Sequence, residues 1–411
     1  MNESNFTPID SYFESITCCY RLKPSICLLI KFKNILWRQP GWPNMHYDRD
    51  RIAAESMLAQ RAQGVVEGKL AALGLTQRQE LAAEAWTQEA ASTAAIEGER
   101  LDLLAVRSSV ERRLGIAADN APATPRHVDG FLDIMDDAVG NAVAPLSHER
   151  LQAWQAALFS TGFSGMSRIR TGAYREHAEP TQIISGRPGR EKVHYEALPS
   201  PQVQHEMAGL IAWFNHADEP DHLARAAFAH LWLETIHPFE DGNGRVGRVL
   251  IDLALARDSG EASRLIRISQ RLLEKRADYY AELERPQHGP LDVTGWMVWF
   301  IVQVRVACEQ ASAVMDASLA KARLWYDHRD KELTLRQRKV INALLDAGPG
   351  GFEGGMSTKK YEHLTGASRA TSSRDLIELA HAGLLRQEGA GRSTRYGLNI
   401  DGWKVMPGAG E

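Results

Sequence analysis

The stretch HPFEDGNGRVGR, from His237 to Arg248, decides how this 411-residue chain is interpreted. Its three glycines match GxGxxG, the fingerprint of a dinucleotide-binding βαβ unit. That fingerprint follows a strand, whereas Leu223, Ala227 and Leu231 ahead of the stretch are spaced as on one face of a helix. The sequence therefore predicts a helix, a glycine-rich turn and a second helix, and it argues against a dinucleotide-binding unit.

The glycine-rich turn has the composition of a phosphate-binding site. Gly242 and Gly244 allow backbone N–H groups to point into one concavity at the start of the second helix, where the helix dipole adds partial positive charge. Arg245 and Arg248 are three residues apart, so they project from the same helix face and can donate to further phosphate oxygens. Together these features suit a triphosphate.

Two residues beside the turn add a metal ligand and a base. Asp241 offers the hard oxygen that Mg²⁺ prefers alongside phosphate oxygens. His237, with a reference pKa of about 6.5, can take a proton from a hydroxyl near neutral pH. His230 lies on the same helix face, but no HExxH pattern, third histidine or cysteine completes a zinc site, so we interpret it as a packed core histidine.

Written as HPFxDGNGRxxR, the stretch resembles the signature motif of the Fic family without a mismatch. The resemblance implies a compact all-helical core with a β-hairpin flap beside the motif, and transfer of AMP from ATP to a hydroxyl side chain of a target protein. It further implies a general base at His237, a Mg²⁺ ligand at Asp241 and a core anchor at Phe239. The implied nucleotide-binding residues are Gly242, Asn243 and Gly244 as the anion nest, Arg245 on the β-phosphate and Arg248 on the γ-phosphate.

The mechanism expected from this resemblance is in-line attack of a target Ser, Thr or Tyr hydroxyl on the α-phosphorus of ATP, with pyrophosphate leaving. Self-modification is one form that this reaction could take. Two alternatives stay open. One is a DNA-binding regulator whose Fic core only senses nucleotide. The other is a Fic enzyme that uses another phosphate donor or removes AMP from a modified target.

A hairpin is predicted between residues 174 and 199, the one stretch without helical character. Its two strands are expected to face each other across the turn at residues 185–189. The hairpin resembles the family's flap, whose exposed edge pairs with an extended segment of the target by strand addition. An ordinary surface hairpin is the alternative. The docking residues expected on the flap are Gln182, Ile183, Ile184, Val193, His194 and Tyr195.

Upstream, Thr93-Ala94-Ala95-Ile96-Glu97-Gly98 resembles the inhibitory motif [S/T]xxxE[G/N] of this family. Thr93 and Glu97 are four residues apart, hence on one helix face, and Gly98 is a natural helix terminator. The resemblance implies that Glu97 pairs with Arg248 and occupies the place of the γ-phosphate. Inhibition is expected within one chain, although it could act across a homodimer.

The chain is expected to be all-α, with four parts. These are a loosely ordered extension (1–36), an N-terminal helical domain with the inhibitory helix (37–120), the Fic core (121–325) and a winged helix-turn-helix domain (326–411). The last part shows the order helix, turn, helix and β-wing, which is typical of a winged helix. Its expected partner is DNA or a protein.

Composition excludes several other classes of protein. With 48 Lys and Arg against 52 Asp and Glu, the chain as a whole lacks the charge for sequence-independent binding to nucleic acid. Its apolar runs fall short of the roughly 18 residues that span a bilayer. The four cysteines show no pairing framework, so the sequence predicts a protein of a reducing compartment, the cytoplasm.

Overall fold

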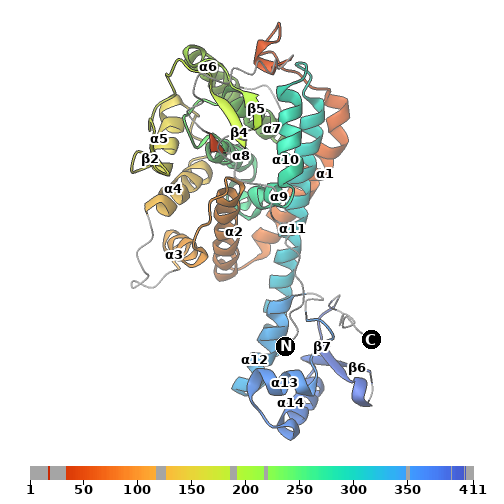
Figure 1. Cartoon of the computed structure of the whole chain (residues 1–411). Helices are drawn as coiled ribbons and strands as arrows, with labels where there is room; N and C mark the ends of the chain where they lie inside the picture. Colours follow the sequence, from red (N-terminus) through yellow and green to blue (C-terminus); the bar gives the residue numbers. More distant parts are fainter. Residues whose placement is uncertain are drawn as a thin grey trace. The chain divides into compact units, whose positions relative to one another are not determined.

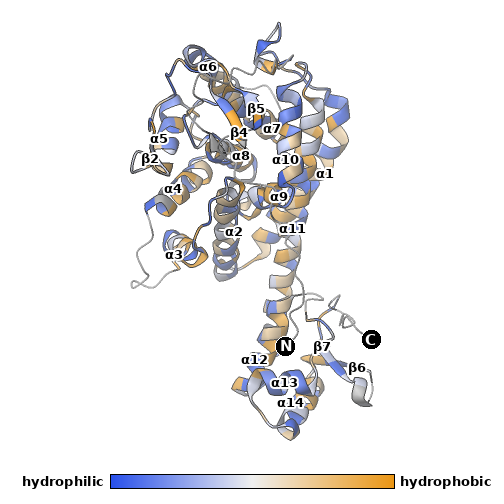
Figure 2. Ribbon diagram, viewed as in Figure 1, coloured by the Kyte–Doolittle hydropathy of each residue, from blue (hydrophilic) through white to orange (hydrophobic). Residues whose placement is uncertain are grey.

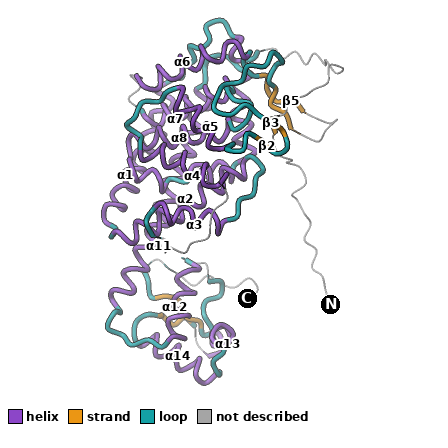
Figure 3. The backbone as a smooth tube through the Cα atoms, turned by 90° about the vertical axis from the view of Figure 1, so that its left-hand side faces the viewer, coloured by secondary structure: helices purple, strands orange, loops and turns teal. Residues whose placement is uncertain are grey.

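The computed structural model of the chain describes residues 17–18, 34–116, 126–185, 192–216, 221–348, 352–389, 391–401 and 403. The chain divides into two compact units, Met1–Ser312 and Ala313–Glu411. Helices dominate both units, and the strands are short (Figure 3). The predicted all-α fold class is confirmed.

The larger unit is a helical assembly with small β elements (Figure 1). Its helices are α1 (Arg49–Ala72), α2 (Leu75–Ile96), α3 (Leu103–Arg113), α4 (Arg126–Gly140), α5 (His148–Leu158), α6 (Ser200–His216), α7 (His222–Ile236), α8 (Asn243–Ser259), α9 (Ile268–Glu274), α10 (Arg276–Gln287) and the first part of α11 (Thr294–Asp327). Its strands are β1 (Thr17–Cys18), β2 (Phe163–Ser164), β3 (Ser167–Arg168), β4 (Gln182–Ser185) and β5 (Lys192–Glu196).

Helices α7 and α8 form the centre of this unit. From Leu223 to Ile236 only Arg225 is more than slightly exposed, because α7 is apolar nearly all round. Asp221 begins the helix by accepting hydrogen bonds from the backbone N–H groups of Leu223 and Ala224. The motif connects the two helices, and Phe239 is fully buried as the expected core anchor.

Helix α2 brings the predicted inhibitory motif to this centre. Its second half is buried against α9 and α8, including Thr93 and Ile96. Glu97 is the C-terminal capping residue, and Gly98 follows with a φ of 79°, a conformation that glycine adopts at little cost. The helix therefore ends where the sequence predicted, with Glu97 at its tip.

The predicted hairpin is present as β4 and β5, which pair antiparallel with Ile183 opposite Tyr195. The turn residues 186–191 lie outside the described residues. One expectation needs correction, because β4 is the middle strand of a three-stranded sheet and its outer edge pairs with β1 of the same chain. Two isoleucines make β4 an apolar strand, which favours such a neighbour (Figure 2). Apart from Thr17–Cys18 and residues 34–36, the expected extension 1–36 lies outside the described residues.

The smaller unit contains α12 (Leu335–Ala347), α13 (Thr358–Thr365), α14 (Arg369–His381) and a hairpin of β6 (Leu385–Glu388) and β7 (Arg395–Leu398). Thr334, Ser357 and Ser368 cap the three helices with their hydroxyl oxygens. The fully buried Tyr361 belongs to the core of the unit. This element order fits a winged helix, and the assignment stays a prediction.

Among the described residues, no helix combines the length and the apolar composition needed to cross a bilayer.

Candidate active site

The turn between α7 and α8 is held in an unusual backbone conformation. Among the described residues, His237 is the one non-glycine residue with a positive φ, at 52°. The buried Arg175 side chain holds this turn, because its Nε donates to the backbone oxygen of His237 at 2.7 Å and its Nη2 donates to that of Ile236 at 3.1 Å. An arginine distant in sequence thus stabilises this strained backbone conformation.

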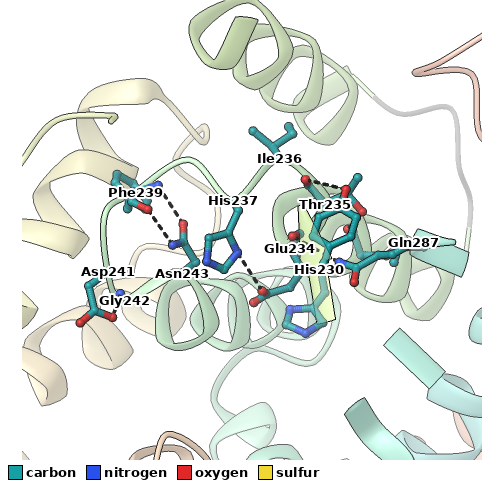
Figure 4. A network of polar contacts seen from close by, with 12 residues as sticks. His230, Glu234, Thr235, Ile236, His237, Phe239, Asp241, Gly242, Asn243 and Gln287 are labelled. Carbon is teal, nitrogen blue, oxygen red and sulfur yellow. Dashed lines mark hydrogen bonds and ion pairs between the residues drawn. The ribbon is translucent and has the colours of Figure 1, made fainter. Parts of the chain in front are cut away.

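Asn243 closes the loop that follows. Its Oδ1 accepts from the backbone N–H of Phe239 at 2.9 Å, and its Nδ2 donates to the backbone oxygen of Phe239, also at 2.9 Å (Figure 4). Both polar atoms of the Asn243 side chain therefore form hydrogen bonds within the loop. Gly242, with a φ of 86°, turns the chain into α8.

Asp241 lies at the rim of this loop. One carboxylate oxygen accepts from the backbone N–H of Gly242 at 2.6 Å, and the other accepts from the hydroxyl of Ser164. Within the described residues no group of three or more His, Cys, Asp or Glu side chains is placed to hold a metal ion. A single carboxylate fits Mg²⁺, which keeps several waters and takes its other ligands from phosphate groups.

A cavity of about 260 Å³ opens beside the loop. It is lined by most of the residues expected in the site, namely Glu97, His237, Asp241, Gly242, Asn243, Gly244, Arg245 and Arg248, and by Ile183, His194 and Tyr195 of the hairpin. The other expected residues, Thr93, Gly98, Gln182, Ile184 and Val193, do not line it.

The second arginine of the motif is already paired. Arg248 is 2% exposed, and its Nη2 donates to Oε1 of Glu97 at 2.6 Å. Its Nε also donates to the Thr93 hydroxyl at 2.5 Å. Burial lowers the pKa of Arg248, but the Glu97 carboxylate, together with Tyr279 and Tyr280, outweighs that effect and raises the pKa above its ordinary value. Gly244 makes room for this contact, because a Cβ there would collide with Glu97 Oε1.

The first arginine is paired as well. Arg245 Nη1 lies 3.2 Å from Oε2 of Glu99, and its guanidinium stacks on the Phe159 ring at 4.9 Å from the ring centroid. Sequence reasoning missed Glu99, although its position two residues after Glu97 was a usable signal. The end of α2 and the turn after it therefore place one carboxylate on each arginine of the motif.

Two known protein families match parts of this chain. Residues 145–255 match the family described as Fic/DOC, and residues 35–116 match the family described as Domain of unknown function (DUF4172). The chain thus contains a domain of the Fic/DOC family. The limits of its domains beyond these matches stay predictions.

Relatives of the Fic domain are known by name. Protein adenylyltransferase fic-1 of Caenorhabditis elegans is 38% identical over 115 residues, which are 27% of this chain and 20% of the relative. Uridine 5′-monophosphate transferase of Xanthomonas campestris is 36% identical over 81 residues, which are 16% of this chain and 15% of the relative. The matched part of the chain thus spans 20% or less of the length of both relatives.

A solved structure shows the same fold. The crystal structure of a Fic family protein from Desulfovibrio desulfuricans matches with a TM-score of 0.51 and 20% identity. The match covers 88% of this chain and 98% of that one.

The Fic domain also contains buried titratable groups behind the motif. Burial, and next the positive charge of Arg175, lower the pKa of His237 to about 3. Burial raises the pKa of Glu234 to about 8. His230 is fully buried with its Nε2 2.8 Å from the Tyr279 hydroxyl, as the packing interpretation predicted.

A tyrosine of the hairpin anchors the flap of the Fic domain to the helical core. Tyr195 is 1% exposed, and its hydroxyl donates to the backbone oxygen of Thr235 at 3.1 Å. Its side chain therefore holds the hairpin on the core, unlike the exposed docking residue that we expected. Ile183, Val193 and His194 are half-buried.

Proposed function

We propose that the chain is a protein adenylyltransferase, which transfers AMP from ATP to a Ser, Thr or Tyr hydroxyl of a target protein. The observation that carries this proposal is one cavity lined by a histidine, a carboxylate, a glycine-rich helix start and two arginines. These are the groups that phosphoryl chemistry needs for proton removal, metal binding and phosphate positioning.

His237 is assigned the role of general base. Burial keeps its imidazole neutral at physiological pH, so a ring nitrogen has a lone pair for the proton of the attacking hydroxyl. As the hydroxyl oxygen forms its bond to the α-phosphorus, the bond from that phosphorus to the pyrophosphate oxygen breaks, and the proton moves to His237.

The triphosphate is assigned to the start of α8. Backbone N–H groups of the turn, with Arg245 and Arg248, would hold the phosphate oxygens and stabilise the charge that moves to pyrophosphate. Mg²⁺, when bound at Asp241, would neutralise part of that charge. Ser164 orients the Asp241 carboxylate through its hydroxyl.

Inhibition by Glu97 is part of the proposal. Its carboxylate lies on Arg248 and against Gly244, where the phosphates are assigned, so the two compete by charge and by space. Thr93 holds Arg248 from the same helix, and Gly98 ends the helix so that Glu97 stands at its tip. Glu99 adds a second carboxylate at Arg245.

A second candidate is transfer of UMP, which is favoured by the similarity to a uridine 5′-monophosphate transferase. The same phosphate-binding groups would serve a uridine nucleotide. DNA binding by the smaller unit and removal of AMP remain alternatives without a supporting observation in the site.

The test uses the full chain with Glu97→Gly and three labelled nucleotides, each with Mg²⁺. These are α-labelled ATP, γ-labelled ATP and α-labelled UTP. Label in protein from α-labelled ATP alone supports adenylyl transfer. Label from UTP alone establishes the second candidate, and label from the γ position would overturn both because it reports phosphoryl transfer.

A further inference from the structure

Glu234 lies in the last turn of α7, three residues before His237. Its Oε2 is 3.7 Å from Nδ1 of His237, and the side chains are 9% and 10% exposed (Figure 4). Both residues line the cavity. Among the described residues, neither Glu234 Oε1 nor His237 Nδ1 makes a hydrogen bond of good geometry, and the backbone oxygen of Glu234 is near enough to the His237 ring to raise its pKa slightly against the effect of burial. A carboxyl group and an imidazole are therefore confined together behind the site.

We propose that Glu234 is a positioning residue for His237, whose carboxylate keeps Nδ1 protonated and stabilises the imidazolium that forms when Nε2 takes the proton of the attacking hydroxyl. This inference rests on the proposed function. The proton passes from the hydroxyl to Nε2, and the positive charge of the ring then faces the negative charge of Glu234. An imidazole buried without such a partner is a weak base.

Gly247 provides the space for this arrangement. A Cβ at this position of α8 would lie 2.8 Å from Glu234 Oε1 and 2.9 Å from His230 Nδ1. Any side chain there would push the glutamate away from its place beside His237. The motif HPFxDGNGRxxR allows any residue at this position. The need for glycine therefore comes from the packing of Glu234 and His230 and not from the motif.

The charges around Glu234 set the pH at which it acts. Burial raises its pKa to about 8, Arg248 on α8 opposes this rise, and Glu97 at the end of α2 adds to it. His230 lies one turn earlier on its own helix, His237 follows the end of that helix, and Tyr279 faces Glu234 from α10. On the other side of His237, Arg175 lowers the pKa of that ring.

The sign of the pH dependence follows from these charges. Below about pH 8 the Glu234 carboxyl is protonated and neutral, and above that pH it is ionised and supports His237. Transfer should therefore rise with pH through this range. Because Glu97 helps to raise the pKa of Glu234, Glu97→Gly should move the rise to lower pH.

The first experiment observes the histidine directly. Ring-¹⁵N signals of His237 in the full chain are followed by NMR between pH 5 and about 9. A step near pH 8 is expected in the parent and should disappear in Glu234→Gln, which keeps the size of the side chain and removes its charge. The matched control is Glu284→Gln, which removes a carboxylate 3.6 Å from His194 in the same cavity and should leave the His237 step in place.

The second experiment measures transfer in the Glu97→Gly chain. Adding Glu234→Gln should lower kcat by about 10-fold or more, leave KM for ATP unchanged and flatten the pH profile. Glu234→Asp, which keeps the charge, should restore part of kcat. Equal melting temperatures of the variants would show that folding is intact.

Two results would overturn the inference. One is a His237 step that persists in Glu234→Gln, and the other is an unchanged pH profile of kcat. If no variant transfers any nucleotide, the proposed function fails, whereas the NMR titration still decides whether Glu234 controls His237.

Discussion

At the scale of single residues, His237 shows how the fold changes the chemistry of a side chain. The free imidazole has a pKa of about 6.5, whereas burial and Arg175 bring the pKa of His237 to about 3. In the proposed mechanism His237 therefore starts the reaction neutral and depends on its surroundings to accept a proton.

His237→Ala should abolish transfer and leave nucleotide binding largely intact, because the base acts on the hydroxyl and not on the phosphates. The loss of a general base is expected to lower the rate by roughly 10²- to 10⁴-fold. The measurement compares the rate of α-label incorporation with the ATP affinity from calorimetry. His205→Ala, at an exposed position of α6, is the matched control. Transfer at the parent rate would remove His237 from the mechanism.

Asp241→Asn should abolish the stimulation of transfer by Mg²⁺, since an amide is a much poorer ligand for this ion than a carboxylate. The substitution keeps the size of the side chain and its contacts with Gly242 and Ser164. Transfer is measured across a Mg²⁺ titration, with Glu240→Gln as the neighbouring control. The metal assignment is wrong if Asp241→Asn keeps full Mg²⁺-stimulated transfer.

The sequence predicted the motif residues because their spacing is itself the signal. It did not predict Ser164 or Arg175, which reach the site through tertiary packing, nor Glu234 and Glu99, which lie close in sequence to His237 and Glu97 but belong to no spacing pattern that the motif defines. The sequence also could not predict the lowered pKa of His237, because that shift depends on how the fold buries the imidazole.

At the scale of secondary-structure elements, the end of α2 controls the start of α8 in the proposed account. Glu97→Gly should raise transfer, because the freed Arg248 can then orient the triphosphate. A change that only weakened the helix end would lower stability by about 1 kcal/mol without raising transfer. The first explanation thus predicts a higher transfer rate, and the second predicts an unchanged or lower one.

A double variant separates these explanations further. Glu97→Gly combined with Arg248→Ala should lose the gain, since the glutamate then has nothing to block. The readout is α-label incorporation at saturating ATP. An unchanged rate in Glu97→Gly, or a double variant as active as the single one, would end the inhibitory assignment.

Helices and strands could be predicted where the residue pattern and the turn-forming residues indicated the same boundary. Gly98 marked the end of α2, and two short non-helical runs on either side of a turn marked β4 and β5. The pairing of β1 with the outer edge of β4 was missed, because two residues far away in the sequence have no periodicity of their own.

At the scale of the whole molecule, the chain contains two compact units, and the proposed nucleotide site lies in the larger one. Ligand binding stabilises only the unit that binds it, by about 2.7 kcal/mol at a ligand concentration 100 times the Kd. In the Glu97→Gly chain, ATP with Mg²⁺ should therefore raise the melting temperature of one calorimetric transition and leave the other in place. If neither transition moves, the larger unit does not bind ATP.

The central claim is transfer of the α-phosphoryl group of ATP to protein, restrained by Glu97. The most direct measurement compares the parent chain, Glu97→Gly and Glu97→Gly with His237→Ala, each incubated with α-labelled ATP, Mg²⁺ and a cell lysate as the source of targets. The account predicts weak labelling of protein by the parent, strong labelling by Glu97→Gly and none above background by the double variant. Equal labelling by all three chains, or labelling by none of them, would contradict it.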